Sequence, residues 1–225
     1  MARDAAEQRE RMVERQLRRR GISDERVLEA MARAPRERFV PESERRRAYA
    51  DGALPIGHGQ TISQPWIVAA IAQALQLSGG ELVLDVGSGS GYSTAVLAML
   101  AGHVIGIERV TELADRSRAL LVELGVRNAE IIAGDGSEGL PDRAPFQAIA
   151  VHATAPAPPR QLIEQLSVGG RLVVPVATDG ADMLTVFRRA GEEIDPRTGA
   201  GIDAATLGAT RFVPLIGRAG FGERE

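Results

Sequence analysis

Seven stretches of the chain carry the apolar pattern of β-strands. They cover residues 82–86, 103–107, 129–133, 146–151, 171–176 and 183–189, with a last strand near 211–213. Between several of these stretches apolar residues recur at helical spacing, from about Ser93, over 111–124 and over 160–166. Strands that alternate with helices are typical of α/β folds, in which helices connect neighbouring parallel strands. The pattern therefore predicts an open, mostly parallel sheet with helices on both faces.

The N-terminal part of the chain predicts helices that precede this sheet. One helix spans 7–20 and ends at Gly21, and a second has Ser23 as its N-cap and ends before Pro35. A further amphipathic helix covers 66–77. The residues expected to face the interior are Met12, Val13, Gln16, Leu17, Val27, Leu28, Met31, Ile67, Ala70, Ile71, Ala74 and Leu75.

The segment 51–65, DGALPIGHGQTISQP, shows neither helical nor strand periodicity. It is rich in glycine, proline and small polar residues, and a loop of this length is more often functional than decorative. Its hydrogen-bonding side chains are Thr61, Ser63 and Gln64, of which Ser63 or Gln64 would alternatively cap the helix that Pro65 begins. Because the loop directly precedes that helix and the first strand, we expect it to fold over a site at the sheet.

The predicted organisation is a single domain in three consecutive parts. Residues 1–78 form the helical extension and the active-site loop, 79–190 form a Rossmann-like core, and 191–225 complete the sheet. Within the last part, 191–208 looks irregular and is expected to be mobile. A length of 225 residues and a hydrophobic content of 44% suit one substantial core.

Composition narrows the functional classes. The chain has no cysteine, which excludes disulfides and thiolate chemistry and suits a reducing cytoplasm. It also has no lysine, which excludes Schiff-base chemistry and a lysine general base. The net charge of −3 does not favour a nucleic-acid partner, and no run approaches the roughly eighteen apolar residues of a membrane span. The charged N-terminus lacks the apolar centre of a signal peptide. We expect a cytoplasmic monomer with no metal.

A glycine-rich turn follows the first predicted strand. Gly87, Gly89 and Gly91 allow the backbone to turn tightly and to approach a ligand with no Cβ in the way. The helix that follows points its N–H groups at the same place. This strand, turn and helix together predict a nucleotide-binding corner.

Acidic residues mark the ends of three predicted strands. Asp85, Glu108 and Asp135 end or follow the first, second and third strands, so all three are expected along one edge. A carboxylate there repels a diphosphate and attracts a cation, and the third glycine, Gly91, falls one place early for the dinucleotide fingerprint. S-adenosylmethionine (AdoMet) carries a sulfonium and an ammonium group, so the pattern favours AdoMet over a nicotinamide dinucleotide. Asp85 is expected at its methionine end, Glu108 at its ribose, and Asp135 or the adjoining backbone at its adenine.

Several motifs resemble one methyltransferase family over most of the chain. They are GHGQTISQP at 57–65, LDVGSGSGY at 84–92, GDGSEGLPDRAPFQAI at 134–149 and QLSVGGRLVVPV at 165–176. GHGQTISQP is the specific one, because many methyltransferases share the glycine loop. From near the N-terminus to about residue 217, the chain resembles the protein-L-isoaspartate O-methyltransferase family of protein-repair enzymes.

The resemblance implies a fold, an activity and a set of residues. The fold is a Rossmann-like AdoMet-dependent methyltransferase with a seven-stranded, mostly parallel sheet and an N-terminal helical extension. The activity is methylation of the α-carboxylate of L-isoaspartyl residues in damaged proteins and peptides, which starts their repair. The family's active-site serine falls on Ser63, and its cofactor contacts fall on Thr61, Ile62, Ser63, Gly87, Glu108, Asp135 and Gly136. Asp85 and Gly89 of the glycine corner complete the expected cofactor site.

The chain also departs from the family pattern. Trp66 stands where tyrosine or histidine is commoner, and the run after the fourth strand is VHATA, which brings His152 to the rim of the site. Two other functions remain open. One is an AdoMet-dependent methyltransferase that acts on a small-molecule carboxylate or hydroxyl, and the other is a non-catalytic AdoMet-binding protein.

Overall fold

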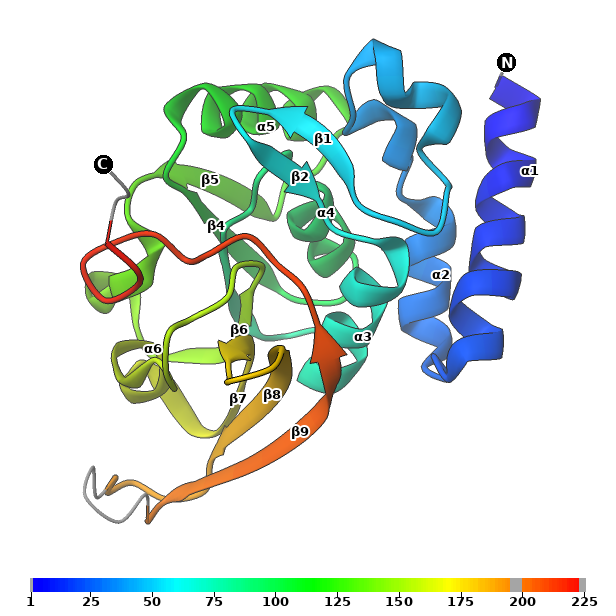
Figure 1. The fold of residues 1–225 in the computed structure, drawn as a ribbon. Helices are drawn as coiled ribbons and strands as arrows, with labels where there is room; N and C mark the ends of the chain where they lie inside the picture. The colour runs from blue at the N-terminus through cyan, green and yellow to red at the C-terminus, as the bar shows by residue number, and fades with distance from the viewer. Residues whose placement is uncertain (1, 195–199, 223–225) are drawn as a thin grey trace.

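A seven-stranded sheet forms the centre of the molecule (Figure 1). The computed structural model describes residues 2–194 and 200–222. The strands lie in the order β5-β4-β3-β6-β7-β8-β9. Six of them run in the same direction, and β8 is antiparallel to the rest. Their bounds are Leu82–Val86 (β3), His103–Glu108 (β4), Ala129–Ala133 (β5), Phe146–Val151 (β6), Leu166–Ala177 (β7), Asp182–Arg189 (β8) and Ile202–Thr210 (β9). The expected seven-stranded, mostly parallel α/β fold is confirmed.

Alternate residues of the central strands pack into two hydrophobic clusters, one on each face of the sheet. Val83 and Val104 face the cluster that contains the N-terminal helices, whereas Leu84 and Ile105 face the opposite cluster. A sheet covered on both faces requires continuous apolar strands, which is why these runs were recognisable in the sequence. The α-helices are α1 (Ala2–Met12), α2 (Glu25–Arg33), α3 (Pro65–Leu75), α4 (Tyr92–Ala98), α5 (Thr111–Glu123) and α6 (Arg160–Glu164). None of the described helices is long and apolar enough to cross a membrane.

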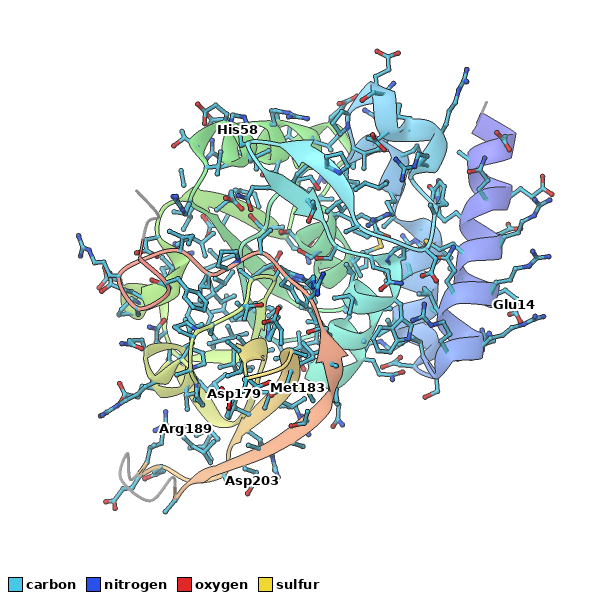
Figure 2. All side chains as sticks on the ribbon, viewed as in Figure 1. Glu14, His58, Asp179, Met183, Arg189 and Asp203 are labelled. Atoms are coloured by element: carbon cyan, nitrogen blue, oxygen red, sulfur yellow. The ribbon has the colours of Figure 1, made fainter. Side chains whose placement is uncertain are left out.

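The N-terminal helices pack against the main body and do not form a separate core. After α1 the helix continues as a π-helical segment, Val13–Leu17, and a 3-10 turn, Arg18–Arg20, and it ends at Gly21 in a left-handed conformation with φ 91°. Met12 and Leu17 are buried in the same cluster as residues of the sheet. Charged side chains such as Glu14 cover the outer surface of this segment (Figure 2). The buried stripe therefore joins the helical extension to the sheet in one hydrophobic cluster.

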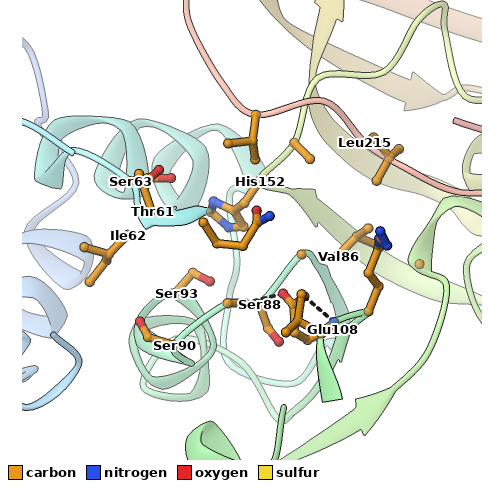
Figure 3. Close-up of a pocket in the computed structure, with 18 of the residues that line it drawn as sticks. Thr61, Ile62, Ser63, Val86, Ser88, Ser90, Ser93, Glu108, His152 and Leu215 are labelled. Atoms are coloured by element: carbon orange, nitrogen blue, oxygen red, sulfur yellow. Dashed lines mark hydrogen bonds between the residues drawn. The ribbon is translucent and has the colours of Figure 1, made fainter. Parts of the chain in front are cut away.

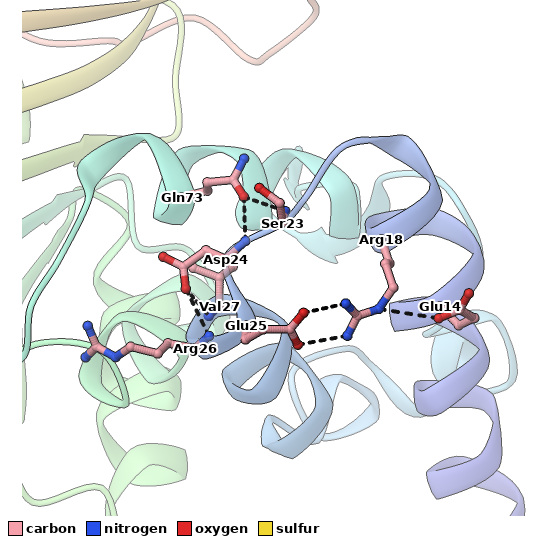
Figure 4. A network of polar contacts seen from close by, with 8 residues as sticks. All are labelled: Glu14, Arg18, Ser23, Asp24, Glu25, Arg26, Val27 and Gln73. Carbon is pink, nitrogen blue, oxygen red and sulfur yellow. Dashed lines mark hydrogen bonds and ion pairs between the residues drawn. The ribbon is translucent and has the colours of Figure 1, made fainter.

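The N-cap of α2 differs from the expected residue. Asp24, not Ser23, accepts hydrogen bonds from the backbone N–H groups of Arg26 at 2.9 Å and Val27 at 3.4 Å (Figure 4). The N–H groups of Ser23 and Asp24 both donate to the Gln73 side chain on α3, at 2.7 and 2.9 Å. This contact fixes the backbone of Ser23 before the helix begins, so the next residue takes the capping position.

The loop over the sheet contains a β-hairpin that the sequence did not predict. Strand β1 spans Leu54–Gly57, β2 spans Gln60–Ile62, and they pair antiparallel. His58 and Gly59, at the turn, have φ angles of 52° and 69°, as a two-residue primed turn requires. The buried apolar side chains of the hairpin are Leu54, Ile56 and Ile62. Three such residues make an alternation of apolar and polar positions that is too short to predict two strands. The helix α3 then begins at Pro65 without a side-chain cap from Ser63 or Gln64.

The C-terminal part of the sheet corrects two further expectations. Strand β7 starts at Leu166, not Arg171, and runs through Gly169 and Gly170, with an irregular register opposite β6. The last strand is Ile202–Thr210, not 211–213, so much of the segment expected to be irregular is an ordered strand paired with β8. Strand β9 lies at the edge of the sheet and is largely exposed, so it lacks the apolar pattern of the central strands. Residues 195–199 lie outside the described residues.

The cap of α2 provides a stability test. Replacing Asp24 with alanine removes the acceptor for two N–H groups and should lower the free energy of unfolding by about 1 kcal/mol. For a chain of this size, thermal melting should then fall by about 2–4 °C. Ser23→Ala is the matched control, because the Ser23 side chain makes no hydrogen bond among the described residues, and its melting temperature should stay unchanged. A larger loss in Ser23→Ala than in Asp24→Ala would show that the cap is assigned to the wrong residue.

Candidate functional site

A pocket opens at the carboxyl ends of the central strands. Its unfilled space is about 860 Å³, part of which is open to solvent. The lining comes from the hairpin, the glycine loop, the ends of β4 and β6, and the segment after β9 (Figure 3). The lining residues that the sequence predicted are Thr61, Ile62, Ser63, Gly87, Gly89, Glu108 and Gly136. Asp85 and Asp135 do not line the pocket.

The glycine loop turns tightly between β3 and α4. Its backbone N–H groups at Gly87 and Ser88 donate to the carbonyl oxygen of Ile107, at 2.9 and 3.2 Å. Gly87, Gly89 and Gly91 all have positive φ angles, of 74°, 54° and 84°. A Cβ at Gly91 would approach Ser117 on α5 to 3.0 Å, and one at Gly89 would meet Ile56 of the hairpin at 3.3 Å. The loop therefore requires glycine both for its backbone shape and for the close approach of its neighbours.

Glu108 joins the end of β4 to the glycine loop. One carboxylate oxygen accepts the N–H of Gly89 at 2.8 Å, and the other accepts the N–H of Val110 at 2.9 Å (Figure 3). The residue is only 7% exposed, and it lines the pocket. A carboxylate has about four lone-pair sites, so Glu108 keeps acceptor capacity on the pocket side. This geometry is suited to ligand hydroxyl groups.

Asp85 lies beneath the pocket and does not face it. Its side chain is fully buried, and one oxygen accepts hydrogen bonds from the hydroxyl groups of Ser93 at 2.8 Å and Thr94 at 2.6 Å. The other oxygen lies 3.1 Å from Nε2 of His152, without the alignment of a hydrogen bond. Direct contact with the methionine end of a cofactor, as expected from the sequence, is therefore not supported by the position of this carboxylate. Instead, Asp85 fixes groups that surround the pocket.

Asp135 binds the C-terminal segment, which is a second departure from expectation. Its carboxylate accepts the N–H groups of Ser137 at 2.9 Å and Arg218 at 2.8 Å. Burial by itself would raise the pKa of Asp135, but the hydrogen bonds from Arg218 and Ser137 outweigh it and hold this pKa below its usual value. A Cβ at Gly217 would collide with this carboxylate. Asp135 thus holds the turn that follows the pocket-lining residues Pro214, Leu215 and Ile216.

The segment Thr61–Ser63 forms one wall of the pocket. A buried guanidinium, Arg36, donates to the carbonyl oxygen of Ser63 at 2.8 Å and to that of Ala48 at 2.7 Å. The same group lies 4.9 Å from the ring centre of Tyr92, which also lines the pocket. Burial lowers the pKa of Arg36 below its ordinary value. The Ser63 main chain is therefore held in place, whereas its hydroxyl makes no hydrogen bond within the described part of the chain.

The residues of the pocket fit AdoMet. One buried polar atom without a hydrogen-bond partner among the described residues, Oγ of Ser88, belongs to a residue that lines the pocket. The glycine loop leaves main chain accessible where a side chain would fill the space, and Glu108 supplies acceptors at the far end. Apolar side chains, Val68, Ile107 and Leu215 among them, complete the wall. Such a combination of apolar lining and a few polar groups is typical of a small-molecule cofactor site.

The fold and this pocket define a Rossmann-like, AdoMet-dependent methyltransferase. Residues 7–220 match the family model described as protein-L-isoaspartate(D-aspartate) O-methyltransferase, and the chain belongs to this family. A protein-L-isoaspartate O-methyltransferase 1 from Rhodopseudomonas palustris is 51% identical over 96% of this chain and 86% of its own length. A protein-L-isoaspartate O-methyltransferase from Aeropyrum pernix is 49% identical over 96% and 82%, respectively.

Two solved structures share the fold over almost the whole chain. One, from Plasmodium falciparum, is assigned as a protein-L-isoaspartate O-methyltransferase and was crystallised with S-adenosyl-L-homocysteine. It superposes with a TM-score of 0.77 at 29% identity, covering 92% of this chain and 98% of that one. The other is a protein-L-isoaspartate O-methyltransferase with a TM-score of 0.80 and 26% identity, covering 94% of this chain and 67% of that one.

Some pocket residues were not recognised from the sequence. Val213–Ile216 reach the pocket because the N–H of Thr154 donates to the carbonyl oxygen of Val213 and the N–H of Leu215 donates to that of Thr154, both at 2.8 Å. No local pattern signals this pairing between distant segments. Ser88, Ser90 and Ser93 were hidden within the glycine loop and the start of α4. The GSGSGYS run itself offered a signal, because glycine neighbours provide no side chains for the serine hydroxyl groups to bind, which leaves these groups available to a ligand.

Glu108 provides a test of the cofactor site. We predict that Glu108→Gln weakens binding of S-adenosylhomocysteine by about tenfold or more. The charged acceptor is lost, and because an amide keeps only one acceptor oxygen, one of the N–H groups of Gly89 and Val110 loses its partner. Isothermal titration calorimetry measures the effect, with the exposed Glu112→Gln on α5 as the control. Equal dissociation constants for Glu108→Gln and wild type would contradict this role.

Proposed function

We propose that this protein transfers the methyl group of AdoMet to the α-carboxylate of L-isoaspartyl residues in damaged proteins and peptides, and so initiates their repair. The observation that supports it is the shared pocket, in which Thr61, Ile62 and Ser63 face the glycine loop and Glu108. The GHGQTISQP motif thus contributes directly to the pocket. Membership of the family and the relatives at about 50% identity support the same activity.

The acceptor requires no general base. An α-carboxylate is ionised at neutral pH, so the nucleophile arrives already charged. AdoMet, when bound, supplies an electrophilic methyl group. The protein must therefore place the carboxylate in line with that methyl group and exclude water. Such placement can lower the activation free energy by about 7–11 kcal/mol.

Ser63 has the position of an acceptor-binding residue. Its hydroxyl is available to donate a hydrogen bond to a carboxylate oxygen, because Arg36 binds the main-chain carbonyl and leaves the side chain unpaired. Thr61 offers a second hydroxyl in the same segment. Glu108 would receive the ribose hydroxyl groups, and the glycine loop would contact the cofactor through its backbone. Asp85 and Asp135 would act indirectly, through the groups they hold.

We further propose that the enzyme works as a monomer in the cytoplasm and does not require nucleic acid. A chain without cysteine depends on no oxidising compartment, and its net charge of −3 gives no general attraction to phosphate backbones. The peptide substrate would be recognised mainly through its main chain, with weak preference for flanking residues. Sedimentation of a single species near 24.0 kDa would support the monomer, and a stable dimer would exclude it.

One assay decides the reaction. Labelled AdoMet is incubated with an isoaspartyl peptide and with its ordinary aspartyl twin, and methyl transfer is followed as volatile methanol after base hydrolysis. Only the isoaspartyl peptide should accept the methyl group. Equal transfer to both peptides, or transfer to neither, would sink the proposal.

Ser63 gives the second test of this reaction. We expect Ser63→Ala to lower kcat by about tenfold to a hundredfold, because one oriented hydrogen bond to a charged acceptor is lost. Binding of S-adenosylhomocysteine should change by less than about twofold. Thr210→Ala, on the exposed edge strand, is the control and should leave both quantities unaltered. If kcat and cofactor affinity fall together in Ser63→Ala, Ser63 serves the cofactor first.

A further inference from the structure

A buried acid–imidazole pair lies at the wall of the pocket. Oδ1 of Asp85 and Nε2 of His152 are 3.1 Å apart, and their side chains are 0% and 6% exposed. Both atoms are buried and have no other partner among the described residues. The second oxygen of Asp85 is already bound by the hydroxyl groups of Ser93 and Thr94. His152 is therefore the only basic side chain that contacts this carboxylate in the described part of the chain.

The position of the imidazole ring is fixed from two sides. The N–H of His152 donates to the carbonyl oxygen of Val86 at 2.9 Å, which continues the pairing of β6 with β3. A Cβ added at Gly87 would lie 3.9–4.0 Å from the main chain and Cβ of His152, so the glycine loop runs close beside this residue. Asp85 attracts the Nε2 edge of the ring. The ring is consequently oriented with its other nitrogen, Nδ1, away from the buried acid.

Nδ1 is the ring nitrogen that is available to a ligand in the pocket. His152 lines the pocket, and its Nδ1 makes no hydrogen bond to a described residue and is not among the fully buried atoms. Figure 3 shows the ring on the side of the pocket where Thr61 and Ser63 lie, with Glu108 at the opposite end. Glu108, which would accept hydrogen bonds from the ribose, and the imidazole of His152 therefore lie in different parts of the pocket. His152 lies on the side of the acceptor substrate.

Charge pairing indicates what this edge would bind. A buried carboxylate is costly unless a hydrogen-bond donor or a positive group accompanies it, and the imidazole of His152 is the group that lies opposite Oδ1 of Asp85. An imidazolium ring donates from both nitrogens, so one ring can bridge two carboxylates, Asp85 at Nε2 and a ligand at Nδ1. A donor with positive charge matches a carboxylate and opposes the sulfonium and ammonium groups of the cofactor. The pair thus selects an anionic acceptor.

We propose that His152, oriented by Asp85, binds the α-carboxylate of the isoaspartyl substrate through Nδ1 and distinguishes it from uncharged analogues. This inference rests on the proposed function and extends it: His152 is a substrate-binding residue, and Asp85 is its positioning residue. Ser63 and His152 would hold the carboxylate from two walls of the pocket.

A binding cycle tests the proposal on protein saturated with S-adenosylhomocysteine. Dissociation constants are measured by calorimetry for an isoaspartyl peptide and for its twin in which the α-carboxylate is a carboxamide. His152→Leu should weaken binding of the isoaspartyl peptide by about tenfold or more and binding of the carboxamide twin by less than about twofold. Asp85→Asn keeps the size of the side chain. It should weaken binding of the isoaspartyl peptide less than His152→Leu does, and again more than it weakens binding of the carboxamide twin. His103→Gln, at the start of β4, is the control.

A second measurement needs no variant of the buried pair. The chain has three histidines, so the imidazole signals of ¹⁵N-labelled protein are assigned by difference, with His58→Asn and His103→Gln identifying the other two. His58 lies at the tip of the hairpin, on the outside (Figure 2). Adding the isoaspartyl peptide to saturated protein should shift the Nδ1 signal of His152, and the carboxamide twin should shift it much less.

The outcomes separate this inference from the proposed function. Wild-type protein that methylates no isoaspartyl peptide refutes the function itself. With methylation intact, equal weakening of both peptides in His152→Leu, or an unshifted His152 signal, overturns the role of His152. A loss of cofactor affinity in His152→Leu as large as its loss of peptide affinity also overturns it, because the ring would then face the cofactor.

Discussion

Parallel pairing of β3 with β4 and β6 is the constraint on which the site depends. Asp85 lies in register with Gly106 on one side and Ala150 on the other, so all three strands end at the same edge. The chain leaves the sheet at this edge after each of the three strands. The glycine loop, Glu108 and His152 therefore lie beside one another. Main-chain hydrogen bonds between these strands bring the segments of the pocket together. The same edge of an open parallel sheet is where such folds bind their ligands.

The edge gathers buried polar groups, each of which needs a partner. Glu108 accepts hydrogen bonds from two N–H groups and Asp85 from two hydroxyl groups, and the imidazole of His152 lies 3.1 Å from the second oxygen of Asp85. Arg36 is fully buried yet contacts no carboxylate among the described residues; carbonyl oxygens and the ring of Tyr92 surround it. A protein selected only for stability would replace such groups with apolar ones. Their retention is explained by what they position, namely the glycine loop, the imidazole of His152 and the Ser63 main chain.

How far the sequence predicted this structure depends on where each segment lies. Strands 82–86, 129–133 and 146–151 were predicted to the residue. The central strands 82–86 and 146–151 are almost wholly buried and therefore need largely apolar runs, whereas 129–133 lies at one edge of the sheet and is only partly buried. Strand 202–210 was missed, since an exposed edge strand places few demands on its side chains. The hairpin was missed for a related reason: its register is fixed by turn geometry and by three buried side chains. The acids at the strand ends were placed at the right edge, but their individual surroundings were not predictable from strand order alone.

The contrast between Asp85 and Glu108 has a geometric cause. Asp85 is followed by Val86 within the strand, so the alternation of the pleat directs its side chain onto the α4 face, among Ser93 and Thr94. Glu108 is the last residue of β4, where the pleat ends and the side chain can point along the edge. Gly106 makes the first arrangement possible, because a Cβ there would lie 3.1 Å from Thr94 and closer still to Ile131. An acid one residue before the end of a strand thus supports the site from beneath, and an acid at the end faces the ligand.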